Sequence, residues 1–198
     1  ERMASANAMP VVNLLSDVGH PMQALADLLT IEQEIGLDKV GKVAYVGDAN
    51  NVWRSLAIGC SMLDIETSIA SPAGHQPIEV DLDRILSSGG SVQVTDDPHE
   101  AVEGADVVYT DVWTSMGQED EKSERLDAFT SFTVDAALME GANANSVFMH
   151  CLPAHRGEEV TNEVIEGPQS RVFLQAHNRM HSARGLLSWI SGEASKND

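Results

Sequence analysis

The stretch VAYVGDANNV, from Val43 to Val52, decides the fold of this chain. Its apolar start predicts a buried β-strand over Val43–Val46. The following Gly-Asp-Ala-Asn-Asn predicts a tight turn and then a helix at Asn51–Met62, because glycine permits sharp turns and Asp and Asn side chains cap helix N-termini. A strand that leads through a short turn into a helix is the building unit of a parallel α/β sheet.

The same alternation continues along the rest of the chain. The predicted strands are Val43–Val46, Ile65–Ala70, Ser91–Thr95, Val107–Thr110, Val147–His150 and Val172–Leu174. The predicted helices are His20–Gly36, Asn51–Met62, Ile78–Ser87, Pro98–Glu103, Val134–Glu140, Glu158–Ile165 and His181–Ile190. Several strands are nearly continuous apolar runs, which indicates a sheet with helices on both faces. We therefore expect a Rossmann-like, doubly wound α/β domain.

The first helix is predicted to begin at His20 and Pro21, because proline suits the first helical position. Its apolar stripe is expected on Leu25, Leu28, Leu29 and Ile35.

The composition restricts the classes of partner. Twelve Lys and Arg residues against 31 Asp and Glu give a net charge of −19, so nucleic acid and anionic membranes would be repelled. No apolar stretch approaches the length of a membrane span, and no signal peptide is visible. Two cysteines are too few for a disulfide framework, which favours a cytoplasmic protein. The acidic, lysine-poor surface fits either a high-salt cytoplasm or an ordinary acidic bacterial protein.

Polar segments follow four of the predicted strands, where ligands bind in sheets of this kind. They are Gly47–Val52, Asp111–Glu119, Cys151–Arg156 and Ala176–Arg179. Each has a purely structural interpretation as well. The asparagines can cap a helix, Asp111 can be a turn residue, and a single cysteine is often a small buried apolar residue.

Other site patterns are absent from the sequence. It contains no G-x-G-x-x-G fingerprint, no Walker A loop, no G-x-S-x-G elbow and no C-x-x-C pair. The histidines lack zinc-ligand spacing. We therefore expect no metal and no cofactor, and a structural role for Cys60, His75, His99 and His181.

Four segments together resemble one family, the aspartate and ornithine carbamoyltransferases. They occur in the family's order and at similar spacing, and the resemblance extends from about Pro10 to Leu187. The segments are HPMQALADLLT (His20 to Thr30), VGDANNV (Val46 to Val52), DVVYTDVWTSMGQE (Asp106 to Glu119) and FMHCLPAHRGEEV (Phe148 to Val160). The S-M-G loop and the H-C-L-P segment favour ornithine over aspartate as the acceptor.

The resemblance implies a reaction and a set of residues. The family transfers the carbamoyl group of carbamoyl phosphate to an amine, here the δ-amine of L-ornithine, which gives L-citrulline and phosphate in arginine metabolism. The implied catalytic residues are Cys151, Asp111 and His20. The implied ornithine-binding residues are Asn51, Asp111, Ser115 and Met116. The implied carbamoyl phosphate-binding residues are His20, Gln23, Cys151, Leu152 and Arg179.

The resemblance also implies an incomplete site. The family's phosphate-binding S-T-R-T segment does not occur in this sequence, and the usual Glu-Asn-Arg near the carboxyl end reads His177, Asn178, Arg179. We therefore expect a chain without most of the carbamoyl phosphate domain. Residues 1–36 would be a remnant of that domain, residues 37–178 the ornithine-binding domain, and residues 179–198 a helix that returns to the missing part. The complete family member is expected to be a homotrimer or a multiple of trimers.

Two alternatives remain open from the sequence. The first is a carbamoyltransferase for another amine, such as putrescine or an acylated ornithine. The second is a non-catalytic amino-acid-binding module. A nucleotide-binding Rossmann domain is disfavoured because the glycine fingerprint is missing.

Overall fold

The computed structural model describes residues 2–114 and 119–194 of the chain. Within these ranges its centre is a parallel sheet of five strands in the order β3-β2-β1-β4-β5. The strands are β1 (Lys42–Val46), β2 (Glu66–Ala70), β3 (Val92–Thr95), β4 (Val107–Thr110) and β5 (Val147–His150). The predicted α/β fold is confirmed, and these five strands lie where the apolar runs placed them.

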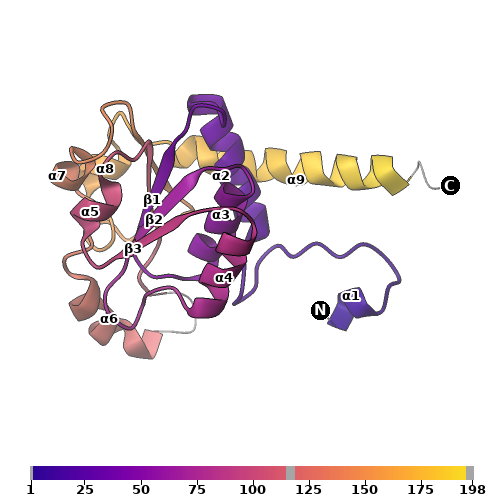
Figure 1. Cartoon of the computed structure of the whole chain (residues 1–198), viewed down its shortest axis with the longest axis horizontal. Helices are drawn as coiled ribbons and strands as arrows, with labels where there is room; N and C mark the ends of the chain where they lie inside the picture. The colour runs from indigo at the N-terminus through magenta and orange to yellow at the C-terminus, as the bar shows by residue number, and fades with distance from the viewer. Residues whose placement is uncertain (1, 115–118, 195–198) are drawn as a thin grey trace.

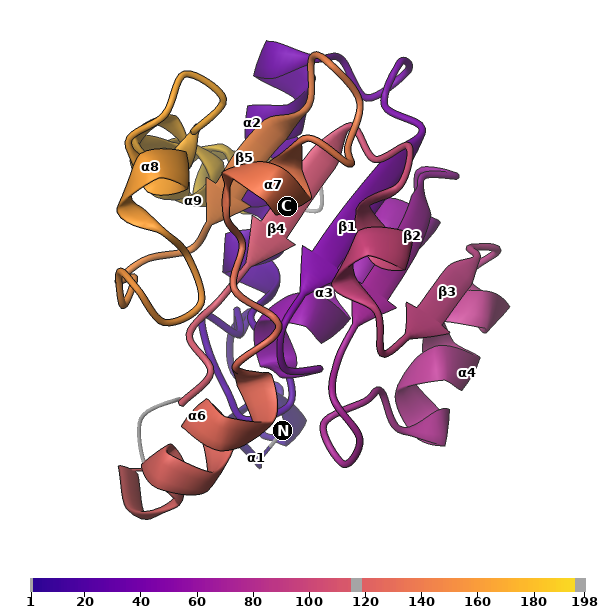
Figure 2. The same cartoon turned by 90° about the vertical axis from the view of Figure 1, so that its left-hand side faces the viewer.

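Helices cover both faces of the sheet (Figure 2). The helices of the described residues are α1 (Arg2–Ser5), α2 (Pro21–Glu34), α3 (Asn51–Ser61), α4 (Glu79–Ser87), α5 (Pro98–Val102), the 3₁₀ helix η1 (Glu119–Glu121), α6 (Lys122–Phe129), α7 (Ala136–Met139), α8 (Asn162–Ile165) and α9 (Val172–Ala194). Helix α1 lies apart from the sheet and buries no residue (Figure 1). Successive strand side chains point to opposite faces. Val43 and Tyr45 therefore pack in one core with α2, α3 and α4, whereas Ala44 and Val46 pack in a second core with α5, α7 and α8.

The predicted strand at Val172–Leu174 is wrong, because these residues begin α9. A short apolar run cannot be assigned to strand or helix by periodicity alone. The buried residues Val172, Gln175 and Asn178 recur every three positions, which is a helical spacing. The helix predicted at His181–Ile190 is thus the second half of α9, which extends away from the sheet (Figure 1). The expected boundary between residues 178 and 179 falls inside this helix.

Two other helix predictions are too long, and α6 was not predicted. The helix expected over Glu158–Ile165 is reduced to α8, because Gly157 N–H donates to Val160 O at 2.8 Å in a turn and Thr161 caps the helix. The helix expected over Val134–Glu140 is reduced to α7, which Asp135 caps in the same way. The sequence of α6, KSERLDAF, has too few apolar residues to show a helical period.

Helix α2 buries a polar stripe besides part of the expected apolar stripe, of which Leu28 and Ile35 pack against the core. Gln23, Asp27 and Thr30 are buried, whereas Leu25 is 42% exposed. Two of these side chains accept hydrogen bonds from α9: Gln175 Nε2 donates to Asp27 Oδ1 at 2.7 Å, and Asn178 Nδ2 donates to Thr30 Oγ1 at 2.9 Å. The helix therefore has packing partners, α3 and α9, within this chain.

Among the described residues, no helix combines the length and the apolarity needed to cross a membrane.

Candidate active site

The candidate site lies at the carboxyl ends of β1, β4 and β5. From β1 the chain proceeds outward through β2 and β3, and then returns to β4 on the other side of β1. This reversal leaves a crevice beyond the strand ends, the usual place for a ligand in an open α/β sheet. A cleft of about 1070 Å³ occupies that place, and Asn50, Asp111 and Cys151 are among its lining residues.

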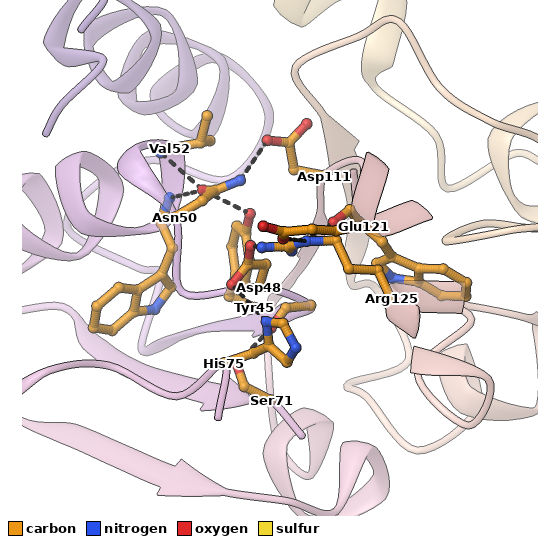
Figure 3. Close-up of polar contacts among 12 residues, drawn as sticks. Tyr45, Asp48, Asn50, Val52, Ser71, His75, Asp111, Glu121 and Arg125 are labelled. Carbon is orange, nitrogen blue, oxygen red and sulfur yellow. Dashed lines mark hydrogen bonds and ion pairs between the residues drawn. The ribbon is translucent and has the colours of Figure 1, made fainter. Parts of the chain in front are cut away.

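Asp111 is at the centre of the hydrogen bonds in this cleft. It follows β4 directly and is 6% exposed. Its Oδ1 accepts from the Cys151 thiol at 3.0 Å. Its Oδ2 accepts from the Asn50 side-chain amide at 2.9 Å (Figure 3). Asn50 is itself fixed, since its Oδ1 caps α3 by accepting from the N–H groups of Val52 and Trp53. Groups that follow β1 and β5, the two neighbours of β4, thus hold the carboxylate that follows β4.

The Cys151 thiol is a hydrogen-bond donor in this arrangement. Burial raises the pKa of Cys151 well above its usual value, and the Asp111 carboxylate raises it further, while Arg179 acts in the opposite direction. The thiolate is the nucleophilic form of cysteine. Because the thiol stays protonated near neutral pH, Cys151 can orient Asp111 but is a poor nucleophile.

We therefore expect Cys151 to react with iodoacetamide at pH 8 at least about 10-fold more slowly than a free cysteine, because its thiolate fraction is suppressed. Intact-mass spectrometry over time measures the rate. The same chain in urea, where both cysteines are exposed, is the control. Alkylation of the folded chain at the rate of the unfolded chain would contradict the protonated thiol.

His20 precedes α2 and is fixed to the next helix, because its backbone N–H donates to Ser55 Oγ at 2.7 Å. Burial lowers the pKa of its imidazole, a hydrogen bond with the Leu14 backbone opposes this, and Arg179 lowers the pKa further while Asp111 raises it. The ring is therefore neutral near pH 7. Within the described residues, Nδ1 has no hydrogen-bond partner. The ring can thus hydrogen-bond a ligand without adding charge to the cleft.

Gln23 is oriented by a buried carboxylate. Its Nε2 donates to Asp27 Oδ1 at 2.8 Å, and its Oε1 has no partner among the described residues. Asp27 also accepts from Gln175 Nε2 at 2.7 Å and from the Tyr109 hydroxyl at 3.3 Å. Burial raises the pKa of Asp27 to about 7, although these hydrogen bonds oppose the rise. Gln23 therefore presents a carbonyl oxygen, which can accept from an N–H group of a ligand.

Arg125 supports the opposite wall of the cleft (Figure 3). Its Nη1 donates to Asp48 Oδ2 and to the Trp113 carbonyl, both at 2.8 Å. Its Nε donates to Glu121 at 3.2 Å. Burial opposes the charge of Arg125, yet Asp48 and Glu121 leave its pKa above the usual value. The guanidinium thus joins α6 to the turn after β1 and to the backbone after β4.

The structure brings most of the predicted site residues to this cleft. The residues among them that line it are His20, Asn51, Asp111, Cys151 and Leu152. Gln23 and Arg179 are not lining residues: Gln23 is buried, while Arg179 is exposed on α9 and affects the pKa of both His20 and Cys151. Ser115 and Met116 lie outside the described residues.

Sequence reasoning missed three residues of the site. Asn50 orients Asp111, whereas the Asn51 side chain donates to the Ser16 carbonyl at 2.7 Å. The two adjacent asparagines were visible in the sequence, but the directions of their side chains could not be predicted from it. Asp27 was visible as an acid on the buried side of a helix. Arg125 had no local signal, because its partners are distant in sequence.

Three comparisons with known proteins find similarity to the same family. The model of the Asp/Orn binding domain of aspartate/ornithine carbamoyltransferases matches residues 39–190. The ornithine carbamoyltransferase of Bacillus subtilis (strain 168) is 52% identical over 100% of this chain and 64% of that protein. The enzyme of the same name from Acidothermus cellulolyticus is 53% identical over 95% of this chain and 62% of that protein.

Solved structures that resemble this chain include ornithine carbamoyltransferases. The ornithine carbamoyltransferase from Pyrococcus furiosus superimposes with a TM-score of 0.88 at 47% identity, covering 94% of this chain and 61% of that one. That from Gloeobacter violaceus gives a TM-score of 0.83 at 42% identity, covering 93% and 63%. The chain thus spans less than two thirds of the length of the relatives it matches.

Proposed function

Because the chain belongs to the aspartate/ornithine carbamoyltransferase family, we propose that its cleft is the ornithine half of an ornithine carbamoyltransferase site. The whole protein would transfer the carbamoyl group of carbamoyl phosphate to the δ-amine of L-ornithine, yielding L-citrulline and phosphate. The observation that carries this proposal is the Asp111 carboxylate, held by Cys151 and Asn50 at the end of the central strands. A buried carboxylate of this kind suits a ligand that bears an ammonium group.

Ornithine would be held at both ends. Asp111 and Cys151 would face the δ-amine, and Asn51, Ser115 and Met116 would hold the α-amino acid group. Asp111 cannot by itself promote deprotonation of the amine, because a neighbouring acid raises the pKa of an ammonium group. It orients the amine instead, and the departing phosphate is the better final proton acceptor.

Carbamoyl phosphate would be held by hydrogen-bond donors at its oxygen atoms and by acceptors at its NH2 group. The neutral His20 ring would donate its single N–H to the carbamoyl oxygen, which gains charge as the amine attacks, in place of its contact with the Leu14 backbone. The Oε1 of Gln23 and the Leu152 carbonyl can accept from the carbamoyl NH2. Because Gln23 Nε2 donates to Asp27, the Gln23 side chain is oriented with Oε1 left to accept. Arg179 would add positive charge on the oxygen side. Holding both reactants in line can supply several kcal/mol of the barrier.

The remainder of the site would come from a carbamoyl phosphate domain. Two observations support this: no S-T-R-T segment occurs in the 198 residues, and the relatives are longer than the part that matches. Exposed apolar side chains gather on the two segments assigned to that contact, including Leu14 and Leu15 before α2 and Leu187 and Trp189 on α9. We propose that these surfaces pack on that domain, that the complete protein is a trimer, and that it works in the cytoplasm.

The acceptor is tested by isothermal titration of the purified chain. We expect L-ornithine to bind at least 10-fold more tightly than putrescine, a difference of about 1.4 kcal/mol, because putrescine lacks the α-amino acid group. An acylated ornithine and L-aspartate are the matched comparisons. Equal affinities for ornithine and putrescine would favour the alternative amine acceptor and contradict the proposal.

Turnover separates an enzyme from a binding module. The 198-residue chain with both substrates is expected to form no citrulline, because its phosphate contacts are incomplete and exposed ion pairs contribute only about 0–1 kcal/mol each. The chain joined to a carbamoyl phosphate domain is expected to form citrulline in a colorimetric assay. Ornithine binding without turnover in the joined protein would identify a binding module instead.

A further inference from the structure

A cluster of three side chains beyond the proposed ornithine contacts has the features of a cation site. His155, Glu158 and Glu159 lie in the turn after β5, and one ligand atom from each lies within 4.8 Å of the others. His155 Nδ1 is 3.8 Å from a Glu158 oxygen and 3.9 Å from Glu159 Oε2. We propose that these three residues bind a divalent first-row transition metal ion, with Zn²⁺ as the best match.

Glu159 contributes an oxygen that already faces the cluster. Its side chain is fully buried. Its Oε1 accepts from the His155 backbone N–H at 2.6 Å and contacts His150 Nε2 at 3.1 Å. Because the Leu152 N–H donates to His150 Nδ1, the hydrogen of that ring is on Nε2 and points to Glu159. Glu159 Oε2, by contrast, has no hydrogen-bond partner within residues 2–114 and 119–194. A buried carboxylate oxygen without a partner is costly, and a shared cation would satisfy it.

The distances fit a shared ion better than direct hydrogen bonds. Separations of 3.8 and 3.9 Å are too long for an N–H···O hydrogen bond. Metal–nitrogen and metal–oxygen bonds of roughly 2.0–2.2 Å place two ligand atoms of a tetrahedral zinc ion roughly 3.3–3.6 Å apart. A movement of a few tenths of an ångström by the half-exposed His155 ring would bring its two distances to the glutamates into this range.

The donor set and the charge favour zinc. Two carboxylates and an imidazole attract a divalent cation, and Lys122 holds the other Glu158 oxygen at 3.1 Å without contacting the free Glu159 oxygen. The neighbouring Arg156 pairs with Glu166. An imidazole ligand suits Zn²⁺, Co²⁺ or Ni²⁺, whereas Mg²⁺ prefers an octahedral shell of oxygen atoms.

A second group of potential ligands, Asp111, His150 and Cys151, is a poorer site. Cys151 already donates to Asp111. Both ring nitrogens of His150 are occupied by hydrogen bonds. A metal ion there would have to break these contacts, whereas the His155 cluster offers an oxygen that is unused within the described residues. The sequence predicted no metal because its histidines lack zinc-ligand spacing, and the turn after β5 is what brings these three side chains together.

The test is a Zn²⁺ titration of the chain after removal of metal with a chelator, followed by calorimetry and by the melting temperature. We expect one equivalent of Zn²⁺ to bind and to raise the melting temperature. His155→Gln and Glu158→Gln should each weaken binding at least about 10-fold, because each removes one ligand (about 1.4 kcal/mol per 10-fold). These two positions are partly exposed, so the variants should fold. Glu159→Gln removes the third ligand but also a buried contact of His150.

Two control variants exclude other sites. Cys151→Ser should leave Zn²⁺ affinity unchanged, and so should His177→Gln, which removes one of the two adjacent histidines on α9. Co²⁺ should give visible absorption typical of a tetrahedral site without a thiolate charge-transfer band. Absence of binding, loss of binding in either control, or unchanged binding in His155→Gln would overturn the proposal.

Discussion

Replacing Asp111 by asparagine is expected to weaken the binding of L-ornithine to this chain by about 10- to 150-fold. The change removes the negative charge opposite the proposed position of the δ-ammonium group. A hydrogen bond to a charged group contributes about 1.5–3 kcal/mol, and each 1.4 kcal/mol corresponds to a factor of 10. Isothermal titration of the two chains with ornithine measures the ratio.

Two variants serve as controls for this result. Cys151→Ser keeps a donor to Asp111 and should change ornithine affinity by less than the Asp111 variant. Asn51→Ala should weaken ornithine more than it weakens a simple diamine, because it acts at the α-amino acid end. A melting temperature measured for each variant shows that the fold is retained. If Asp111→Asn bound ornithine as tightly as the original chain, the assignment of Asp111 to the amine would be wrong.

Asp27 is expected to make the free energy of unfolding fall as the pH rises from about 4 to about 7. Its pKa is raised from 3.8 in the unfolded chain to about 7 in the folded chain, chiefly by burial. The folded chain thus binds the proton more tightly, so the stabilisation is fully present below about pH 4 and declines as the pH rises toward 7. The linkage relation gives a loss of about 3 kcal/mol over this interval.

Asp27→Asn should remove this dependence. The asparagine resembles the protonated acid: its Oδ1 can accept from the amides of Gln23 and Gln175, and its Nδ2 can donate to the Tyr109 hydroxyl. Urea unfolding of both chains between pH 4 and pH 8 gives the difference in unfolding free energy at each pH. The matched control is Asp64→Asn, since Asp64 is an exposed turn residue. A difference between the Asp27 variant and the original chain that does not change with pH would contradict a raised pKa.

The sequence predicted the sheet well because several of its strands are nearly continuous apolar runs. Every described strand overlaps a predicted run, and the turn Gly47–Asn50 was placed correctly before α3. Val172–Leu174 failed because its residues pack as the first turn of a helix, and the contacts responsible come from α2, about 150 residues earlier in the chain. Local patterns carry no information about such partners.

The site was only partly predictable for a related reason. Motifs indicated which segments meet at the strand ends, so Asp111, Cys151 and His20 were placed in one cleft. They did not indicate which of two adjacent asparagines turns toward Asp111. Nor did they indicate the Arg125 contact with Asp48, since the two residues are 77 positions apart. These choices depend on side-chain direction, which is fixed by tertiary packing.

The polar contact between α2 and α9 also determines how far one helix can shift along the other. Leucines can slide past each other with little loss, but hydrogen bonds require particular distances and angles. The pairs Gln175–Asp27 and Asn178–Thr30 therefore lock the helical register. One residue inserted between Asn178 and Arg179 would rotate Arg179 by about 100° around the helix axis. The position of that arginine relative to His20 thus depends on two buried amide side chains, and insertions or deletions should be far less tolerated here than in the loops.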